Sequence, residues 1–185
     1  MAHARIGSLV VALVLVVTAS MGTRPAAAAS AGEINRDVDA ALTKLYADVP
    51  DARALAKRAK AILVFPSIVK AGFLFGAQYG DGALRRGGKT VGYYNSVAAS
   101  YGFQAGVQSF GYVLFFMTDS ALAALNKTEG FELGVGPSIV VLDSGAAKAL
   151  TTTTMQSDVY AFIFDQRGLM AGAGLQGSKI SRIDR

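Results

Sequence analysis

Positively charged side chains gather at two places in the sequence. Arg53, Lys57 and Lys60 stand at positions i, i+4 and i+7, so a helix would carry them along one face. A second group lies in the segment Arg85-Arg-Gly-Gly-Lys89, which is typical of a basic hairpin tip. Each Lys or Arg near an anionic lipid surface contributes on the order of 1 kcal/mol. The residues that we assign to headgroup contact are Arg53, Lys57, Arg58, Lys60, Lys70, Arg85, Arg86 and Lys89. An ordinary solvated surface stays open as the other interpretation.

Apolar side chains precede the first basic group at helical spacing. Leu42, Leu45 and Tyr46 are the ones that we predict to enter a headgroup layer, as the apolar face of an amphipathic helix does. The aromatic pairs Phe73/Phe75 and Phe115/Phe116 are expected in the core rather than on a ligand-binding surface.

Three short motifs resemble signatures of catalysis or phosphate binding, and the context argues against each. Residues 172–177 match G-x-G-x-x-G, but too few residues follow for the helix, strand and acid that a dinucleotide site needs. Residues 83–90 resemble a phosphate loop, but a strand pattern follows instead of a helix. Residues 67–70 match S-x-x-K without the partner motifs S-D-N and K-T-G. We therefore expect Lys70 at the surface, where it can extend its amine into solvent.

The N-terminus has the pattern of a secretory signal peptide over residues 1–29. Ile6–Thr18 is apolar throughout and shorter than the ~20 residues of a membrane-spanning helix, and small residues follow at 26–31. An uncleaved anchor is the alternative. Removal of the signal would take Arg5 and Arg24, leaving 16 of the 18 basic residues against 13 acidic ones, a net charge of +3. We expect export to the periplasm, cell envelope or medium.

Residue types that support most catalysis are missing from the mature chain. The sequence has no Cys, and its one His, His3, lies in the signal. A Ser-His-Asp triad, a thiol nucleophile and a His-ligated zinc site are thereby excluded. We predict no enzyme, no catalytic residue, no metal site and no cofactor. A net charge of +3 is mild, and we predict no nucleic-acid partner.

The sequence predicts that helices come first along the chain and strands follow, and these elements must position the basic residues. Ser30 and Glu33 form a capping box, and the helix that it opens should end at Pro50. A second helix is expected over 52–60, with Asp51 as its cap. Residues 119–127 predict a short capped helix. Within residues 30–185 we expect a single domain, with a helical N-terminal region over 30–60 and a β-rich body over 61–185.

The β-rich body is expected to contain many short strands. The apolar run 61–65 is closed by Pro66, and residues 71–79 alternate with Gly on one face. Residues 91–107 and 110–118 together predict two or three strands. Glycines that recur on one strand face predict close packing or a sharp bend. Further strands are expected at 131–135, 138–142, 158–164, 169–175 and 178–183. Without long crossover helices, the fold class is α+β with a strongly curved, mostly antiparallel sheet, sandwich or barrel.

Three ordered blocks of the sequence resemble the SYLF domain family. They are LAKRAKAIL at 55–63, KAGFLFGAQYG at 70–80 and GLMAGAGLQGS at 168–178. The resemblance runs over roughly 48–183 and implies phospholipid binding. In eukaryotic members it implies phosphoinositide binding through an N-terminal amphipathic helix, which would be residues 30–60 here, and in fungal members also actin binding. We do not extend actin binding to an exported chain, and generic anionic phospholipid is the expected ligand.

The leading hypothesis is a non-catalytic, exported protein that associates with anionic phospholipid membranes through its basic N-terminal region. The alternative is a structural component of the cell envelope, either an oligomeric scaffold or an outer-membrane-associated β protein. The Gly-rich alternating strands favour the alternative. The sequence leaves lipid selectivity and oligomeric state open.

Overall fold

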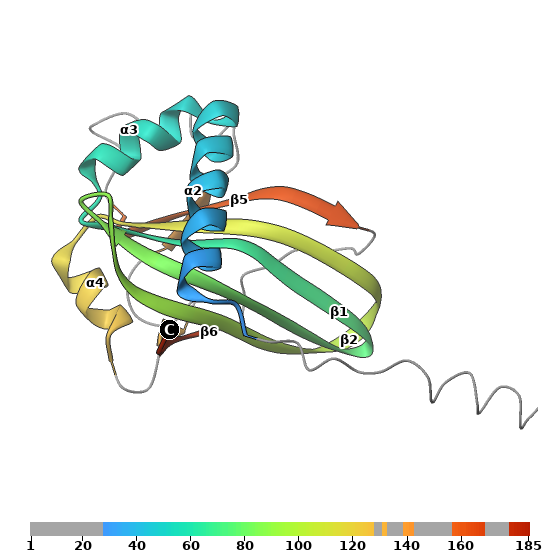
Figure 1. Cartoon of the computed structure of the whole chain (residues 1–185). Helices are drawn as coiled ribbons and strands as arrows, with labels where there is room; N and C mark the ends of the chain where they lie inside the picture. The colour runs from blue at the N-terminus through green and yellow to red at the C-terminus, as the bar shows by residue number, and fades with distance from the viewer. Residues whose placement is uncertain (1–27, 128–130, 133–138, 143–156, 169–177) are drawn as a thin grey trace, which may run out of the picture.

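A computed structural model describes residues 28–127, 131–132, 139–142, 157–168 and 178–185 (Figure 1). The predicted signal peptide lies outside these residues except for its last two positions. The strand expected at 169–175 also lies outside them, as does part of the strands expected at 131–135 and 138–142.

Two helices open the domain. Helix α2, Ala31–Asp48, begins at the predicted capping box: the Glu33 backbone N–H donates to Ser30 Oγ, and the Ser30 N–H donates to Glu33 Oε2. Helix α3 spans Pro50–Arg58. The expected second cap is wrong, because α3 begins at Pro50 rather than after Asp51. Proline suits the first position of a helix, where its missing N–H has no partner to lose.

The two longest strands form one antiparallel hairpin. Strand β1 is Ala61–Arg86 and β2 is Lys89–Phe116, and the turn between them holds Gly87 and Gly88 at positive φ, as a tight hairpin turn requires. The prediction that Pro66 closes a strand is wrong, as is the prediction of two or three strands over 91–118. The pairing shifts register between Phe65 and Ile68, so Pro66 lies in an irregularity where the ladder needs no N–H.

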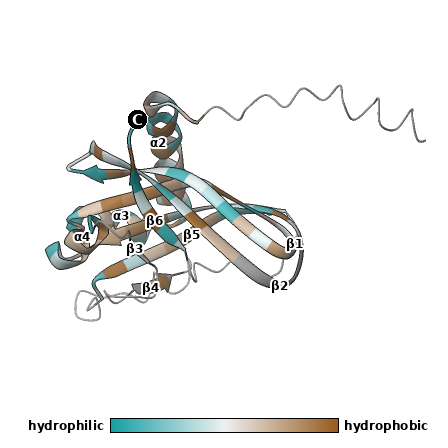
Figure 2. Ribbon diagram, turned by 90° about the horizontal axis from the view of Figure 1, so that it is seen from below, coloured by the Kyte–Doolittle hydropathy of each residue, from teal (hydrophilic) through white to brown (hydrophobic). Residues whose placement is uncertain are grey.

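Strand β1 reverses direction near its middle. A Cβ added at Gly80 would lie 2.5 Å from the Ser67 carbonyl oxygen, and one at Gly82 would collide with the Val64 carbonyl oxygen. Backbones therefore touch where the two halves of β1 meet, which confirms the close packing and sharp bend predicted from glycines on one face. Figures 1 and 2 place the bend at the end of the sheet away from α3 and α4.

The remaining strands flank the hairpin on both sides. The sheet order is β3 (Phe131–Glu132), β6 (Lys179–Ile183), β2, β5 (Val159–Gly168) and β4 (Ile139–Leu142), with β1 also paired to β2. Only the β4–β5 pair is parallel among the described pairs. The prediction of an α+β fold with a curved, mostly antiparallel sheet is confirmed; over the described strands it is one sheet that is not closed on itself.

Two apolar cores lie on opposite faces of this sheet. Inside the curl, residues such as Leu63, Phe65 and Tyr112 pack with the short helix α4, Asp119–Leu125. On the outer face, α2 and α3 cover Val64, Phe115 and their neighbours. Neighbouring residues of β1 thus alternate between the two cores, as the pleat of a strand requires.

Candidate functional site

A groove of about 410 Å³ lies where both helices meet the tip of the β1–β2 hairpin. Its lining comprises Asp39, Leu42, Tyr46, Ala56, Lys57, Ala59, Lys60, Ala61, Ile62, Arg85, Gly87 and Gly88. The structure therefore brings together three cations from the two predicted basic groups and two of the predicted inserting residues. A volume of this size lies in the range of small-molecule pockets.

The two helices place their share of the lining by simple periodicity. Asp39, Leu42 and Tyr46 stand at i, i+3 and i+7 on α2 and so share one face of it. Lys57 is on α3, and Lys60 is the last residue before β1. The Lys60 backbone N–H donates to the Phe116 carbonyl at 2.8 Å, which fixes the passage from helix to sheet.

Arg85 is the most enclosed cation of the groove. Its side chain is 13% exposed, and its Nη2 donates to Asp39 Oδ1 at 2.7 Å and to the Asn35 carbonyl at 3.2 Å. Its Nε–H is buried and has no acceptor among the described residues. A buried donor without an acceptor costs free energy. A ligand oxygen in the groove would supply the missing acceptor for this Nε–H.

A polar cluster ties the N-terminal half of α2 to the hairpin beside the groove. The Asn35 side-chain amide donates to Tyr93 Oη at 2.9 Å, and Thr90 Oγ1 donates to Asn35 Oδ1 at 2.6 Å. Together with the Arg85–Asp39 pair, these bonds hold the groove face of α2 against β1 and β2.

The C-terminal half of α2 is tied to β5 through one ion pair. Lys44 Nζ lies 2.6 Å from Asp165 Oδ1, and this hydrogen bond, with a further contribution from Arg167, holds the pKa of Asp165 below its ordinary value of 3.8. The pair therefore helps to position Leu42 and Tyr46, which project from the same helix.

We expect Asp165→Asn to flatten the acid side of the stability profile. Because the folded-state pKa is lowered, the carboxylate stabilises the fold above pH 3.8 and loses its effect as the pH falls through the folded-state pKa. Asn tolerates the positive φ of 51° at this position. Urea unfolding should show a deficit of Asp165→Asn at neutral pH that shrinks below about pH 3. Asp48→Asn, at an exposed end of α2, is the control, and an equal deficit at both pH values would contradict the assignment.

The other predicted cations surround the groove or lie away from it. The Arg53 guanidinium carbon Cζ lies over the Tyr46 ring, 5.4 Å from its centroid. Burial raises the pKa of the Tyr46 hydroxyl. Lys60 lines the groove, and its Nζ also lies 3.4 Å from Asp119 Oδ2.

The remaining predicted cations do not line the groove. Arg86 and Lys89 are exposed at the hairpin tip, and Arg58 is exposed on α3. Lys70 is half-buried on β1, three residues before the register shift between Phe73 and Phe75.

Leu45 is a correction to the predicted inserting set. It is fully buried between α2 and the sheet, together with Ile34 and Val38, so it cannot reach a bilayer while α2 stays docked. Leu42 and Tyr46 are half-buried at the edge of that contact. The apolar face of the amphipathic helix is thus mostly part of the core.

Sequence reasoning missed several groove residues. Asp39 shares the helix face of Leu42 and Tyr46, and that spacing could have identified it. No local signal could have placed Ile62 or the hairpin glycines there, because their position depends on how α3 docks against the tip.

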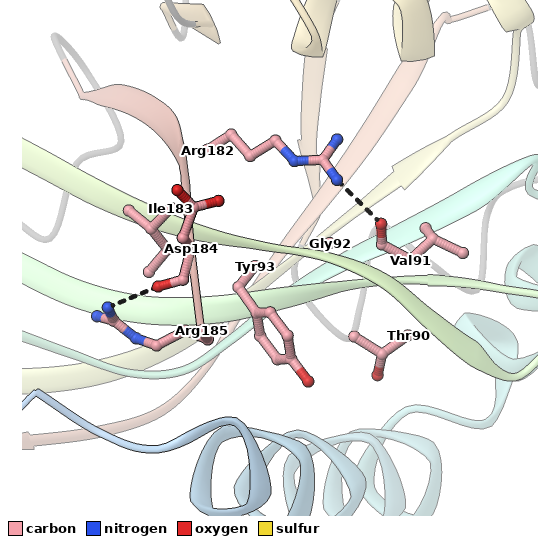
Figure 3. Close-up of a pocket in the computed structure, with 8 residues that line it drawn as sticks. All are labelled: Thr90, Val91, Gly92, Tyr93, Arg182, Ile183, Asp184 and Arg185. Carbon is pink, nitrogen blue, oxygen red and sulfur yellow. Dashed lines mark hydrogen bonds between the residues drawn. The ribbon is translucent and has the colours of Figure 1, made fainter.

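A second hollow, of about 310 Å³, lies between β2 and the C-terminal residues (Figure 3). Arg182 Nη2 donates to the Val91 carbonyl oxygen at 3.4 Å, and Arg185 Nη2 lies 2.9 Å from Asp81 Oδ2. None of the predicted headgroup residues lines it. Among the described residues, no group of three or more His, Cys, Asp or Glu side chains is placed to hold a metal ion.

The fold and the groove together define the class of this protein: it is an α+β domain with a cationic groove beside its helices. Residues 97–184 match the family model Ysc84, described as Las17-binding protein actin regulator. This is the SYLF domain family, so the resemblance predicted from the sequence blocks is confirmed over that part of the chain. The family is described as lipid- or actin-binding. A search of the curated proteins found no match to the chain. The matched segment begins after the groove residues, so the groove has to be judged on its own chemistry.

Proposed function

We propose that this chain is an exported, non-catalytic phospholipid-binding protein that associates with anionic membrane surfaces through the groove. The observation that carries the proposal is the convergence of Lys57, Lys60 and Arg85 on one apolar-lined hollow. The family's description as lipid- or actin-binding supports a lipid partner. Actin is not proposed, because the predicted signal would export the chain.

In this proposal the groove binds a headgroup and α2 remains docked. The three cations attract the phosphate oxygens, and the Nε–H of Arg85, which has no acceptor among the described residues, offers one of them a charge-assisted hydrogen bond. Leu42, Tyr46 and Ile62 contact the apolar part of the lipid next to its headgroup. Over the described residues, no helix has the length and apolar character to span a bilayer.

Asp39 is the one acidic side chain in the groove lining, and we expect Asp39→Asn to strengthen binding to anionic vesicles. The carboxylate neutralises Arg85 and would repel a phosphate. Removing one charge near the membrane surface should raise affinity about fivefold at low salt, which corresponds to about 1 kcal/mol. Co-sedimentation with vesicles of phosphatidylcholine and phosphatidylglycerol measures it.

Asp48→Asn is the matched control for this experiment. It removes the same charge from the same helix outside the groove lining. Equal gains from both variants would show that net charge alone acts, and a loss of affinity in Asp39→Asn would contradict headgroup binding beside Arg85.

A further inference from the structure

Apolar side chains are exposed on the outer face of the β1–β2 bend. Phe75 is 70% exposed and Val107 is 60% exposed, although Phe75 was expected in the core. We use the name bend face for Val69, Ala71, Phe75, Ala77, Tyr79, Val97, Ala99 and Val107, all of which are exposed. Phe115 and Phe116, by contrast, are buried as expected.

Strand register places these residues in outward-facing pairs before and after the bend. Ala71 pairs with Val107, Ala77 with Ala99, and Tyr79 with Val97 across the antiparallel ladder. Directly opposed residues of a ladder point to the same face, so each pair projects outward together, and the pairs follow one another along both strands around the bend. This end of the sheet lies away from α3 and α4 (Figure 2).

The inner face of the same segment is small and polar. Gln78 is buried and donates to Ser178 Oγ at 2.7 Å, and Gln108 is buried with its Oε1 lacking a donor among the described residues. Gly76 and Gly80 are buried on that side as well. An antiparallel sheet in water usually has the opposite arrangement, with apolar residues inside and polar residues outside. Outward apolar and inward polar residues are typical of strands that face lipid.

Charges at the margins of the bend face fit an anionic bilayer. Lys179 pairs with Val97 on one side and with Glu132 of β3 on the other, and Arg167 pairs with Ser109, so an exposed cation stands at each margin of the bend face. Arg167 and Lys44 share Asp165, and this trio keeps a net charge of +1. None of the residues that define the bend face is acidic. Anionic headgroups would be attracted by the positive charge that the trio of Lys44, Asp165 and Arg167 retains.

Tyr79 has the orientation expected at the edge of a lipid contact. Its ring is half-exposed, and its hydroxyl donates to Asp81 Oδ1 at 2.6 Å, next to the ion pair between Asp81 and Arg185. Tyrosine is enriched at membrane interfaces because one end of its side chain is apolar and the other is polar.

We propose that the bend face enters the apolar layer of a phospholipid bilayer, as a second contact besides the groove. This inference rests on the proposed lipid binding. The two surfaces lie at opposite ends of the sheet, so each can be changed without altering the other. Contact of the bend face with lipid does not require that the groove meet the same bilayer.

A single introduced tryptophan tests the contact, because the full chain contains no Trp. Phe75→Trp places an indole on the bend face, and Val141→Trp places one at an exposed apolar position on β4, outside it. With vesicles of phosphatidylcholine and phosphatidylglycerol, we expect the emission of Phe75→Trp to shift to shorter wavelength and to be quenched by lipids with brominated acyl chains. Val141→Trp should show neither change.

The contact should also resist salt once it has formed. At about 1 M salt, where charges are screened within about 3 Å, the quenching of Phe75→Trp should persist. Phe75→Ser should weaken vesicle binding under these conditions about tenfold, because it removes a large apolar area, and Val141→Ser should not.

Each remaining outcome overturns the inference. If Phe75→Trp sediments with vesicles while its indole stays in water, the bend face is not a lipid contact although the proposed function survives. If the emission shift occurs without lipid and follows protein concentration, the face joins copies of the chain. If no variant binds vesicles, the proposed function and the bend contact fail together.

Discussion

Lys57→Glu combined with Lys60→Glu is expected to abolish binding to anionic vesicles at low salt. The two lysines line the groove together with Arg85 of the hairpin. Each reversal changes the local charge by two, and at about 1 kcal/mol per charge the pair should lower affinity by a hundredfold or more. Co-sedimentation at low salt, with unfolding curves recorded in parallel, measures the loss.

Folding should tolerate this double replacement. Lys57 is exposed, and the Lys60–Asp119 pair is formed by side chains that are 49% and 70% exposed. Ion pairs between such exposed groups contribute little to stability. The unfolding midpoint is therefore expected to change only slightly.

Arg36→Glu combined with Lys127→Glu is the matched control. Both residues are exposed, both lie outside the groove lining, and the net charge of the chain changes equally. We expect the control to lose only a small part of its affinity through long-range electrostatics. Equal losses in the two double variants would contradict a localised groove.

Gly82→Ala is expected to destabilise the domain on the order of 2–3 kcal/mol, a typical cost of overpacking a core. A Cβ at this position would collide with the Val64 carbonyl oxygen and lie 2.7 Å from a Phe65 ring carbon. Both neighbours are fully buried, Val64 on the outer face of β1 and Phe65 inside the curl, so they have little freedom to move away. Urea unfolding should show a lower midpoint with an unchanged slope.

Gly32→Ala is the control for the effect of glycine itself. No heavy atom lies within 4 Å of a Cβ built at Gly32, in the first turn of α2. Alanine there should leave stability unchanged or raise it by up to about 1 kcal/mol. A Gly82→Ala protein as stable as this control would contradict the reversal of β1 on itself.

Local patterns in the sequence predicted the helices and the hairpin tip well. The Ser30 and Glu33 capping box and the paired glycines 87 and 88 are short-range signals, and local hydrogen bonds or backbone angles decide their outcome. The glycines of β1 likewise predicted the bend. The long strands were divided in the prediction, because Pro66 normally ends a strand and nothing local shows that a register shift can absorb it.

Burial was harder to predict than secondary structure. Leu42 and Leu45 look alike in sequence, yet only Leu45 faces the sheet, because the angle at which α2 docks decides which side of its apolar stripe is covered. Phe75 continues an alternation that usually faces a core, and its exposure follows from a bend that turns the alternate face inward. The spacing of Lys57 and Lys60 predicted one part of the groove lining. The position of Arg85 in that lining depends on tertiary contacts, which local sequence does not show.

Vesicle co-sedimentation of the unaltered full chain, comparing neutral with anionic phospholipid at two salt concentrations, tests the central claim most directly. The N-terminus of the protein should be recorded by mass spectrometry, so that any contribution of residues 1–29 is known. We predict strong binding to anionic vesicles at low salt, and a weaker residual binding at about 1 M salt, where the Debye length is about 3 Å. Failure to bind either vesicle type at either salt concentration would contradict lipid recognition and favour a scaffold role in the cell envelope.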